Sequence, residues 1–474
     1  MTRESPGNPL HERYATDRMA AIFSAGHRYA TWRRLWVLLA ECQAELGLPI
    51  TPAHLAALRE AAPRLDLERV AELELQTRHD VVAHLRHFAE QAGEAGGILH
   101  LGATSAFVTD NTDLLLAREA LELVEERLAT AIRGLADFAR RRRSQPCLAY
   151  THFQPAQLTT IGKRACLWAQ DLVLDLEEVR RLRRDLPCRG VKGTTGTQAS
   201  FLTLFDGNHE KVRELDRRLA QRLGFARSIA VSGQTYTRKI DSRILATLAG
   251  VAESCHKLGT DLRLLQGVGE LSEPFDDTQV GSSAMAYKRN PVRSERMCSL
   301  ARRILTDAVN GPLTAATQWL ERSLDDSANR RLVLPDAFLA ADAVLALAGH
   351  IGAGLRVDDG AVARRVDREL PFMATETLLM QATLRGGNRQ ELHERIRKYS
   401  FQAQDLVAGG APNPLLGTIS GDPEFHLSAA EVAAWVAPER FVGRAPEQVD
   451  EFLQEVVEPA LAGSAISAVE APRV

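Results

Sequence analysis

The sequence predicts an all-α protein organised around a bundle of long helices. Apolar residues recur at three- and four-residue steps between Asp110 and Arg143, which places them on one face of a helix. Strand-like alternation of apolar and polar residues is scarce. Similar helical patterns follow over residues 159–184, 238–271, 293–319 and 334–355. Because such helices exceed the average length in globular proteins, we expect them to pack lengthwise against one another.

The segments on either side of the long helices have a different character. Residues 1–104 carry shorter helical patterns that glycine and proline interrupt, and the tail after residue 357 contains further Gly- and Pro-rich breaks. We therefore expect three domains. They are an N-terminal helical domain (1–104), a central long-helix domain (105–357) and a C-terminal helical domain (358–474).

The overall composition excludes several classes of protein. The chain has 474 residues, with 58 basic and 61 acidic side chains and a formal net charge of −3, which argues against a nucleic-acid binder held by net charge. Its six cysteines form no CxxC pair, so we expect reduced thiols in a cytoplasmic protein. The first residues lack the apolar core of a signal peptide, and no window approaches 18 uncharged apolar residues. Neither secretion nor a membrane span is expected.

Four polar segments rich in Gly, Thr and Ser interrupt the helical patterns. They are Arg78–Asp80 together with residues 100–105, then residues 151–157, 190–198 and 281–291. Helix ends offer unpaired N–H groups that bind carboxylate or phosphate, and glycine lets a ligand approach the backbone. Four such segments in one chain predict a site for an anionic ligand.

The last of these segments, GSSAMAYKRNP over residues 281–291, resembles the GSSxMPxKxNP signature of the fumarase/aspartase superfamily. The motifs TRHDVVAH, HLGATS, THFQPAQLTT, RGVKGTTGTQASF and LDDSANRR are similar to those of adenylosuccinate lyases, most of all the longer, animal-type branch. The resemblance extends from about Arg13 to residue 446. It implies the fumarase/aspartase-like fold with three domains. It also implies a C–N lyase that eliminates fumarate from adenylosuccinate, giving AMP, and from succinylaminoimidazole carboxamide ribotide.

This elimination requires a base, an acid and fixed positive groups, because the proton removed lies beside a carboxylate and the intermediate is doubly charged. The resemblance implies that Ser282 is the base. A serine is a poor base unless its pKa is lowered, and we expect Lys288, six residues further on, to supply the nearby charge that does so and to stabilise the dianion. His152 would protonate the departing nitrogen. We expect His79 near the phosphate or assisting the acid, and Glu295 orienting Lys288 or His152.

The same resemblance implies a set of substrate-binding residues. Guanidinium groups suit a substrate with two carboxylates and a phosphate, because each can form bidentate bonds. Arg13 and Tyr14 are expected at the phosphate or ribose, and Gln234 at the succinyl portion. The full set is Arg13, Tyr14, Arg78, Asp80, His100, Thr104, Ser105, Thr151, Gln234, Asn290, Arg296, Arg322, Ser327 and Arg331.

A metal site at His79, His84 and His87 is not expected. Only His84 and His87 have the spacing of one helical face, and no Glu or Cys completes a zinc or iron set. The resemblance implies no metal and no cofactor. It does imply a homotetramer around a central helix bundle, with each site assembled from three subunits and a small succinyl-nucleotide as substrate.

Other interpretations stay open at this stage. Ala286 replaces the proline of the signature, so ordering this loop is expected to cost more conformational entropy, which would alter loop closure rather than chemistry. The chain could act on another succinylated amine, serve as an inactive scaffold, or bind a nucleotide without turnover. The presence of Ser282, Lys288 and His152 together favours the enzyme, because packing alone would not require all three.

Overall fold

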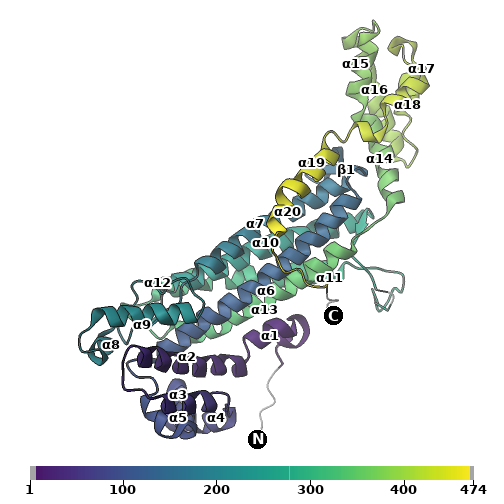
Figure 1. Cartoon of the computed structure of the whole chain (residues 1–474). Helices are drawn as coiled ribbons and strands as arrows, with labels where there is room; N and C mark the ends of the chain where they lie inside the picture. Colours follow the sequence, from purple (N-terminus) through teal and green to yellow (C-terminus); the bar gives the residue numbers. More distant parts are fainter. Residues whose placement is uncertain (1–6, 277, 470–474) are drawn as a thin grey trace.

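The computed structural model describes residues 7–276 and 278–469, which form an elongated and mostly helical molecule (Figure 1). The prediction of an all-α fold is confirmed. The first six and last five residues of the expected terminal domains lie outside the described ranges.

Five long helices form the central bundle. They are α6 (Ser105–Arg141), α7 (Ile161–Asp185), α10 (Lys239–Gly267), α11 (Val292–Asp307) and α13 (Asp326–Gly354). Helix α6 packs against α7 and α13, while α10 packs against α7, α11 and α13. At 1.5 Å per residue, the 37 residues of α6 span about 56 Å. The bundle therefore separates whatever lies at its two ends by that length.

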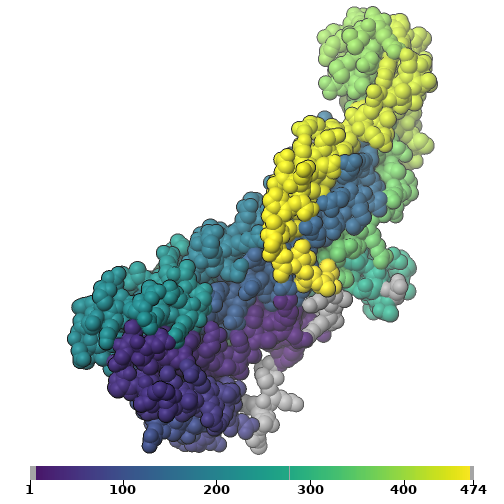
Figure 2. All heavy atoms as spheres, viewed as in Figure 1, coloured from purple at the N-terminus to yellow at the C-terminus, as the bar shows by residue number. Residues whose placement is uncertain are grey.

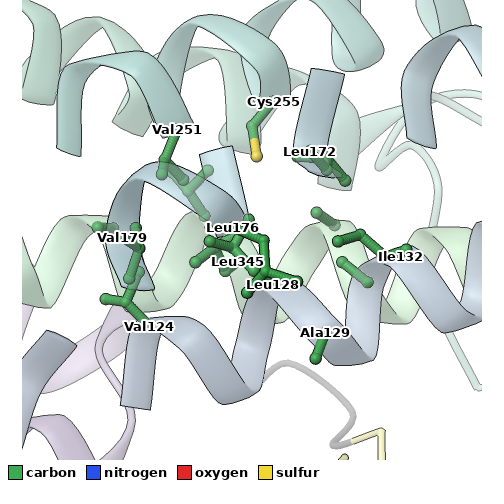
Figure 3. Close-up of a cluster of buried hydrophobic side chains, with 14 of the residues drawn as sticks. Val124, Leu128, Ala129, Ile132, Leu172, Leu176, Val179, Val251, Cys255 and Leu345 are labelled. Atoms are coloured by element: carbon green, nitrogen blue, oxygen red, sulfur yellow. The ribbon is translucent and has the colours of Figure 1, made fainter. Parts of the chain in front are cut away.

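The interior of the bundle is formed by aliphatic side chains from four helices, as Figure 3 shows. Leu128, Leu176 and Leu345 are each 0% exposed. Each helix contributes residues three or four positions apart, which is the spacing that the sequence pattern predicts. The labelled set is Val124, Leu128, Ala129 and Ile132 of α6, Leu172, Leu176 and Val179 of α7, Val251 and Cys255 of α10, and Leu345 of α13.

Two of the predicted long helices have other bounds. The pattern over residues 293–319 is divided between α11 and α12 (Asn310–Thr317). The break has a physical cause: Pro312 has no N–H for the carbonyl of Ala308, and its ring would collide with that carbonyl in a continuous helix. In contrast, α13 begins eight residues before the predicted start at 334 and continues through Pro335.

Helix α13 is long and apolar enough to cross a membrane by length and composition alone, although Asp336 and Asp342 interrupt its apolar residues. It is the one such helix in the described chain, with an 18-residue window of mean hydropathy 1.8. However, 78% of that window is buried inside the protein. Its apolar character is that of a core helix of the bundle.

Most of the remaining helices lie at the two ends of the bundle (Figure 1). At one end are α2 (Ala25–Glu45), α3 (Pro52–Ala61), α4 (Leu67–Thr77), α5 (Asp80–Ala92), η2 (Gly93–Ile98), α8 (Ala199–Leu204) and α9 (His209–Arg222). The first two helices, η1 (Leu10–Tyr14) and α1 (Asp17–Ile22), lie along the side of the bundle, where Arg18 pairs with Glu126 of α6. At the other end are α14 (Asp359–Met373), α15 (Thr375–Leu384), α16 (Arg389–Ala408), α17 (Leu415–Gly421), η3 (Pro423–Phe425), α18 (Ala429–Trp435) and η4 (Pro438–Arg440).

The chain then returns to the bundle. Helices α19 (Ala445–Phe452), η5 (Leu453–Val457) and α20 (Glu458–Leu461) pack against α7 and α6, so they lie on the bundle surface (Figure 2). Arg180 of α7 fixes this segment by donating a hydrogen bond to the carbonyl of Ala460, at 2.6 Å. The segment after residue 358 is thus divided between an outlying group of helices and a strap along the bundle.

Two short sheets were not expected from the sequence. β1 (Pro146–Thr151) pairs antiparallel with β2 (Gln154–Thr160), and β3 (Leu271–Ser272) pairs antiparallel with β4 (Arg356–Val357). The β1–β2 hairpin follows the end of α6. In its register Thr151 faces Gln154, which leaves a two-residue turn between them.

Replacing a core leucine tests the packing of the bundle. Leu128→Ala is expected to lower stability by about 2–5 kcal/mol, because it leaves a cavity between α6, α7 and α13. Thermal denaturation of the variant and the wild type measures this loss. The matched control is Leu75→Ala, since Leu75 is 68% exposed on α4, and its expected effect is below about 0.5 kcal/mol. Equal losses in both variants would contradict the described core.

Candidate functional site

The candidate residues gather at separate places in the chain. One group lies where α6 begins, a second joins η1 to α11, a third is the loop between β3 and α11, and a fourth is the turn of the β1–β2 hairpin. Each group is set by a local feature of the fold, described in turn below.

The group at the start of α6, here called the histidine cluster, comprises Arg78, His79, Asp80, His100, Thr104, Ser105 and Arg331. Arg78 ends α4 with φ 55°, and α5 begins at Asp80, so the chain turns sharply at His79. His79 Nε2 lies 3.5 Å from Ser105 Oγ, and His79 Nδ1 lies 3.4 Å from Asp80 Oδ1. These contacts bring α5 and α6 together.

Arg331 of α13 joins the histidine cluster through Asp80. Its Nη2 donates to Asp80 Oδ2 at 2.7 Å. Burial by itself would raise the pKa of Asp80, but the hydrogen bond and charge of Arg331 outweigh it, so the pKa lies below its ordinary value. Arg78, His79 and Arg331 are exposed, so their polar groups face solvent.

His100 is held in the same cluster by a tryptophan. Trp36 Nε1 donates to His100 Nδ1 at 2.9 Å, and His100 takes a left-handed conformation with φ 62°. Burial, with a smaller contribution from His79, lowers the pKa of His100 to about 4. His100 is therefore neutral at pH 7 and carries its proton on Nε2, available as a donor.

Gln234, Arg322 and Ser327 lie at the same end of the bundle. The backbone N–H of Gln234 donates to the carbonyl of Glu321 at 2.9 Å, which ties the two segments together. Arg322 Nη1 donates to Asp326 Oδ1 at 2.8 Å, and Ser327 follows in the first turn of α13.

The polar segment over residues 190–198 begins as a buried structural element. Lys192 is 4% exposed, and its Nζ donates to Asp216 Oδ2 at 2.6 Å. Gly196 has φ 84°, and a side chain there would collide with the carbonyl of Ser232. Only glycine allows this close approach. The exposed hydroxyls of the segment, including Thr195, therefore lie beside residues 232–234.

The second group joins η1 to α11. The guanidinium of Arg296 lies 5.8 Å from the ring centre of Tyr14, and Arg13 is close enough to influence its charge. Arg296 Nη1 is buried and has no hydrogen-bond partner among the described residues. Burial lowers the pKa of Arg296. This positive group therefore offers a free donor to an anion.

The third group is the signature loop, residues 278–291, which projects away from the bundle (Figure 1). Ser282 Oγ accepts hydrogen bonds from the N–H groups of Ala284 and Met285, at 3.3 and 3.1 Å. Asn290 Nδ2 donates to the carbonyl of Gly281 at 2.8 Å and so closes the loop at its base. Lys288 is exposed, and within the described chain its ammonium forms no hydrogen bond or ion pair.

The backbone at Ala286 has the geometry that suits the proline found at this position in the family signature. The N–H of Lys288 donates to the carbonyl of Met285 at 3.0 Å, which makes Ala286 the second residue of a turn. Proline is favoured at that place in common turns. The effect of Ala286 on loop closure stays a prediction.

Glu273 anchors the loop, and the sequence argument missed it. It is 2% exposed and accepts from the N–H groups of Arg293 and Ser294, at 2.9 and 2.8 Å, and from Ser294 Oγ at 2.7 Å. Its carboxylate thus caps the first turn of α11. Glu295, in contrast, is exposed and contacts neither Lys288 nor His152 within the described part of this chain. Its proposed role stays a prediction.

The fourth group is the turn of the hairpin. His152 and Phe153 have φ 53° and 57°, and both are exposed. Such turns usually contain Asn and Gly, and a left-handed non-glycine residue costs about 1–3 kcal/mol. Tyr150 anchors β1 by donating to Glu270, and burial followed by this hydrogen bond raises the pKa of Tyr150 to about 12.

These groups do not meet within one chain. The histidine cluster lies at the start of α6, and the hairpin that carries Thr151 and His152 follows its end. The length of α6, about 56 Å, separates them. A site that uses both must therefore combine different copies of the chain.

Two of the three histidines considered for a metal, His84 and His87, are structural. His87 Nε2 accepts from the N–H of Asp66 at 3.1 Å, and His84 packs between the rings of Tyr29 and Trp32. Burial lowers the pKa of His84 to about 4. In residues 7–276 and 278–469, no group of three or more His, Cys, Asp or Glu side chains could hold a metal ion.

Comparison with known families and proteins gives consistent matches. A family model described as Lyase matches residues 12–306, and one described as adenylosuccinate lyase C-terminus matches residues 371–452. Adenylosuccinate lyase of Saccharomyces cerevisiae is 49% identical over 460 residues, covering 96% of this chain and 95% of that protein. That of Schizosaccharomyces pombe is 46% identical, covering 97% and 96%.

Solved structures share the fold at lower identity. A fumarate lyase from Mesorhizobium sp. BNC1 matches with a TM-score of 0.79 and 24% identity, covering 97% of this chain and all of that one. The 3-carboxy-cis,cis-muconate lactonizing enzyme from Pseudomonas putida matches with a TM-score of 0.82 and 24% identity, covering 96% of this chain. At this identity, the likeness concerns the fold.

The low pKa of His100 predicts a loss of stability in acid. Between its ordinary pKa of 6.5 and the folded value of about 4, the unfolded chain binds a proton that folded His100 does not. Stability is therefore complete above pH 6.5 and falls as the pH is lowered toward 4, by at most about 3 kcal/mol from this residue. His100→Gln, whose amide oxygen can still accept from Trp36, should flatten the curve of thermal midpoint against pH.

The control for this measurement is His209→Gln, a substitution at an exposed residue in the first turn of α9. Its curve should follow that of the wild type. If the His100→Gln curve is as steep as the wild-type curve between pH 6.5 and 4, His100 does not titrate as described.

Proposed function

The chain belongs to the adenylosuccinate lyase family, and from that membership we propose which residues carry the reaction and how copies of the chain assemble the site. It is a C–N lyase that eliminates fumarate from adenylosuccinate, giving AMP, and from succinylaminoimidazole carboxamide ribotide. Both reactions belong to purine biosynthesis. No finding favours another succinylated amine.

Ser282 is the base in this proposal. It removes the proton from the carbon next to a succinyl carboxylate, and the electron pair left on that carbon gives the doubly charged intermediate. The observation that carries this assignment is the pair of backbone N–H groups, of Ala284 and Met285, that donate to Ser282 Oγ. Such donors stabilise the alkoxide form that a basic serine requires.

Lys288 and His152 complete the chemistry. The unpaired ammonium of Lys288 stabilises the negative charge that develops on the carboxylate. His152, exposed on the turn of the hairpin, gives its proton to the departing nitrogen as the C–N bond breaks. Fumarate and the nucleotide with its free, neutral amino group are then the two products. Glu295 is retained as a carboxylate that orients Lys288 or His152 of another copy.

The basic residues bind the anionic groups of the substrate. Arg13, Tyr14 and Arg296 would hold the phosphate or ribose, and the buried free donor of Arg296 supports this role. The remaining contacts come from the loops and helix ends at the start of α6, from the signature loop and from the hairpin. They are Arg78, His79, Asp80, His100, Thr104, Ser105, Thr151, Gln234, Asn290, Arg322, Ser327 and Arg331.

We place the active form as a homotetramer with each site shared between three subunits. Two observations support it: the separation of the candidate groups along α6, and exposed apolar side chains on the bundle. Leu167 and Leu174 of α7 are 52% and 59% exposed, and Leu313 of α12 is 60% exposed. Such a surface suits contact with further copies. A cytoplasmic location is supported by six cysteines that are all free and buried.

The activity test follows the ultraviolet absorbance of adenylosuccinate with purified protein. We expect the wild type to form AMP and fumarate, and Ser282→Ala to be slower by about 100-fold or more. The matched control is Ser283→Ala, the neighbouring exposed serine of the loop. Binding without turnover would indicate a nucleotide-binding regulator. Turnover of only another succinylated amine would indicate a paralogue, and neither would indicate a scaffold.

Mixing two inactive variants tests the shared site. Ser282→Ala and His152→Gln should each be inactive as pure tetramers. After subunit exchange, about a quarter of the sites should receive a native Ser282 and a native His152 from different chains, so activity should return. Light scattering should give four times 52.1 kDa. An active monomer, or no recovery despite proven exchange, would contradict this arrangement.

A further inference from the structure

We propose that Asp326 is a positioning residue that holds the Arg322 guanidinium in place for an anionic group of the substrate. The proposal rests on the proposed function, because Arg322 is there a substrate contact. It assigns a role to a residue that the motif resemblance does not include among the site residues.

Asp326 bridges two guanidinium groups in the first turn of α13. Its Oδ1 accepts from Arg322 Nη1 at 2.8 Å, and its Oδ2 accepts from Arg238 Nε at 2.6 Å. The side chain of Asp326 is 0% exposed, and that of Arg238 is 1% exposed. Both carboxylate oxygens are therefore engaged in a dry environment, where such hydrogen bonds are strong and directional.

The charge of Arg238 does not by itself explain why Asp326 is buried beside it, because another carboxylate already neutralises Arg238. Asp110 of α6 accepts from both Arg238 Nη1 and Nη2, each at 3.2 Å. Burial by itself would lower the pKa of Arg238, but neighbouring negative charges, first of all Asp110, raise it above its ordinary value. Arg238 is thus a fixed cation with its own counter-charge. It holds Asp326 in place, and the second carboxylate oxygen of Asp326 is left to bind Arg322.

Arg322 is left with donors to spare. In the described chain its only hydrogen bond from the guanidinium is the one to Asp326, so Nε and Nη2 have no partner. Its side chain is 24% exposed. Because a guanidinium is planar, a hydrogen bond at one nitrogen restricts the directions that the other donors can take. These donors can then bind a carboxylate or phosphate without first losing side-chain freedom.

The backbone before α13 is fixed as well. Gln234 donates its N–H to the carbonyl of Glu321, the residue before Arg322. A side chain at Gly233 would collide with Glu321, so the two segments lie in direct contact. The base of the Arg322 side chain is therefore held by Gln234, and its tip by Asp326.

The test measures KM and kcat of the tetramer for Asp326→Asn. The amide can accept from one guanidinium but turns an N–H₂ group toward the other, so Arg322 loses its fixed orientation. We expect KM to rise about tenfold while kcat changes less than about twofold. Arg322→Gln should raise KM at least as much. If Asp326 acts through Arg322, the double variant should be no worse than Arg322→Gln alone.

Glu125→Gln is the matched control. Glu125 also bridges two guanidinium groups, with Arg180 Nε at 2.8 Å and Arg183 Nε at 3.0 Å, but it lies about 30 Å along α6 from Ser105. It should lower the thermal midpoint and leave KM unchanged. If Asp326→Asn does not assemble, Arg322→Lys provides the readout. Lysine keeps the charge but lacks the planar fork, so its single nitrogen cannot present the pair of donors that Asp326 orients in Arg322, and KM should rise about tenfold.

If the wild type is active and Asp326→Asn or Arg322→Lys has the same KM as the wild type, this proposal is overturned and the proposed function is not. Effects of Asp326→Asn and Arg322→Gln that multiply in the double variant would do the same, because they would show independent roles. A wild type that releases no fumarate would overturn the proposed function and this inference together.

Discussion

The burial of the long apolar faces of α6, α7, α10 and α13 is the constraint on which the rest of the structure depends. Leu128, Leu176 and Leu345 are removed from water only if these helices lie side by side along their whole length. Polar segments cannot enter such a core without losing hydrogen bonds to water, so they gather at the helix ends and in loops. The candidate site residues are therefore placed at the ends and sides of a rod-shaped bundle.

A rigid rod of this kind holds each part of the site firmly but keeps the parts distant. His152 lies on a turn that costs free energy, and the bundle provides the surrounding structure that maintains it. The histidine cluster lies about 56 Å away along α6, so under the proposed function neither part would form the site by itself. In the proposed assembly, association of several copies would complete the site and would also cover the apolar residues exposed on α7 and α12. Stability and activity would depend on the same contacts.

The sequence predicts those features that leave a local pattern. The long helices were predictable because burial of one face imposes a repeat of about 3.6 residues, and the motif residues were found because they are contiguous. The hairpin was missed because its turn, His152–Phe153, contains neither Asn nor Gly. Glu273 and Asp326 were missed for another reason. Their partners, Ser294 and Arg238, are far from them in sequence, so only the folded chain reveals the pairing.

The buried charges at the start of α6 are costly features for stability alone. Taking Asp110, Arg238 and Asp326 out of water carries a desolvation penalty that apolar side chains of similar size would avoid. What the charges provide is direction, since a salt-bridged guanidinium cannot rotate freely. A substrate with three anionic groups is bound most selectively by cations whose positions are fixed before it arrives. The ion pairs that run from Asp110 through Arg238 and Asp326 to Arg322 are buried at their start. They end at a partly exposed guanidinium, which is the arrangement that binding an anionic substrate requires.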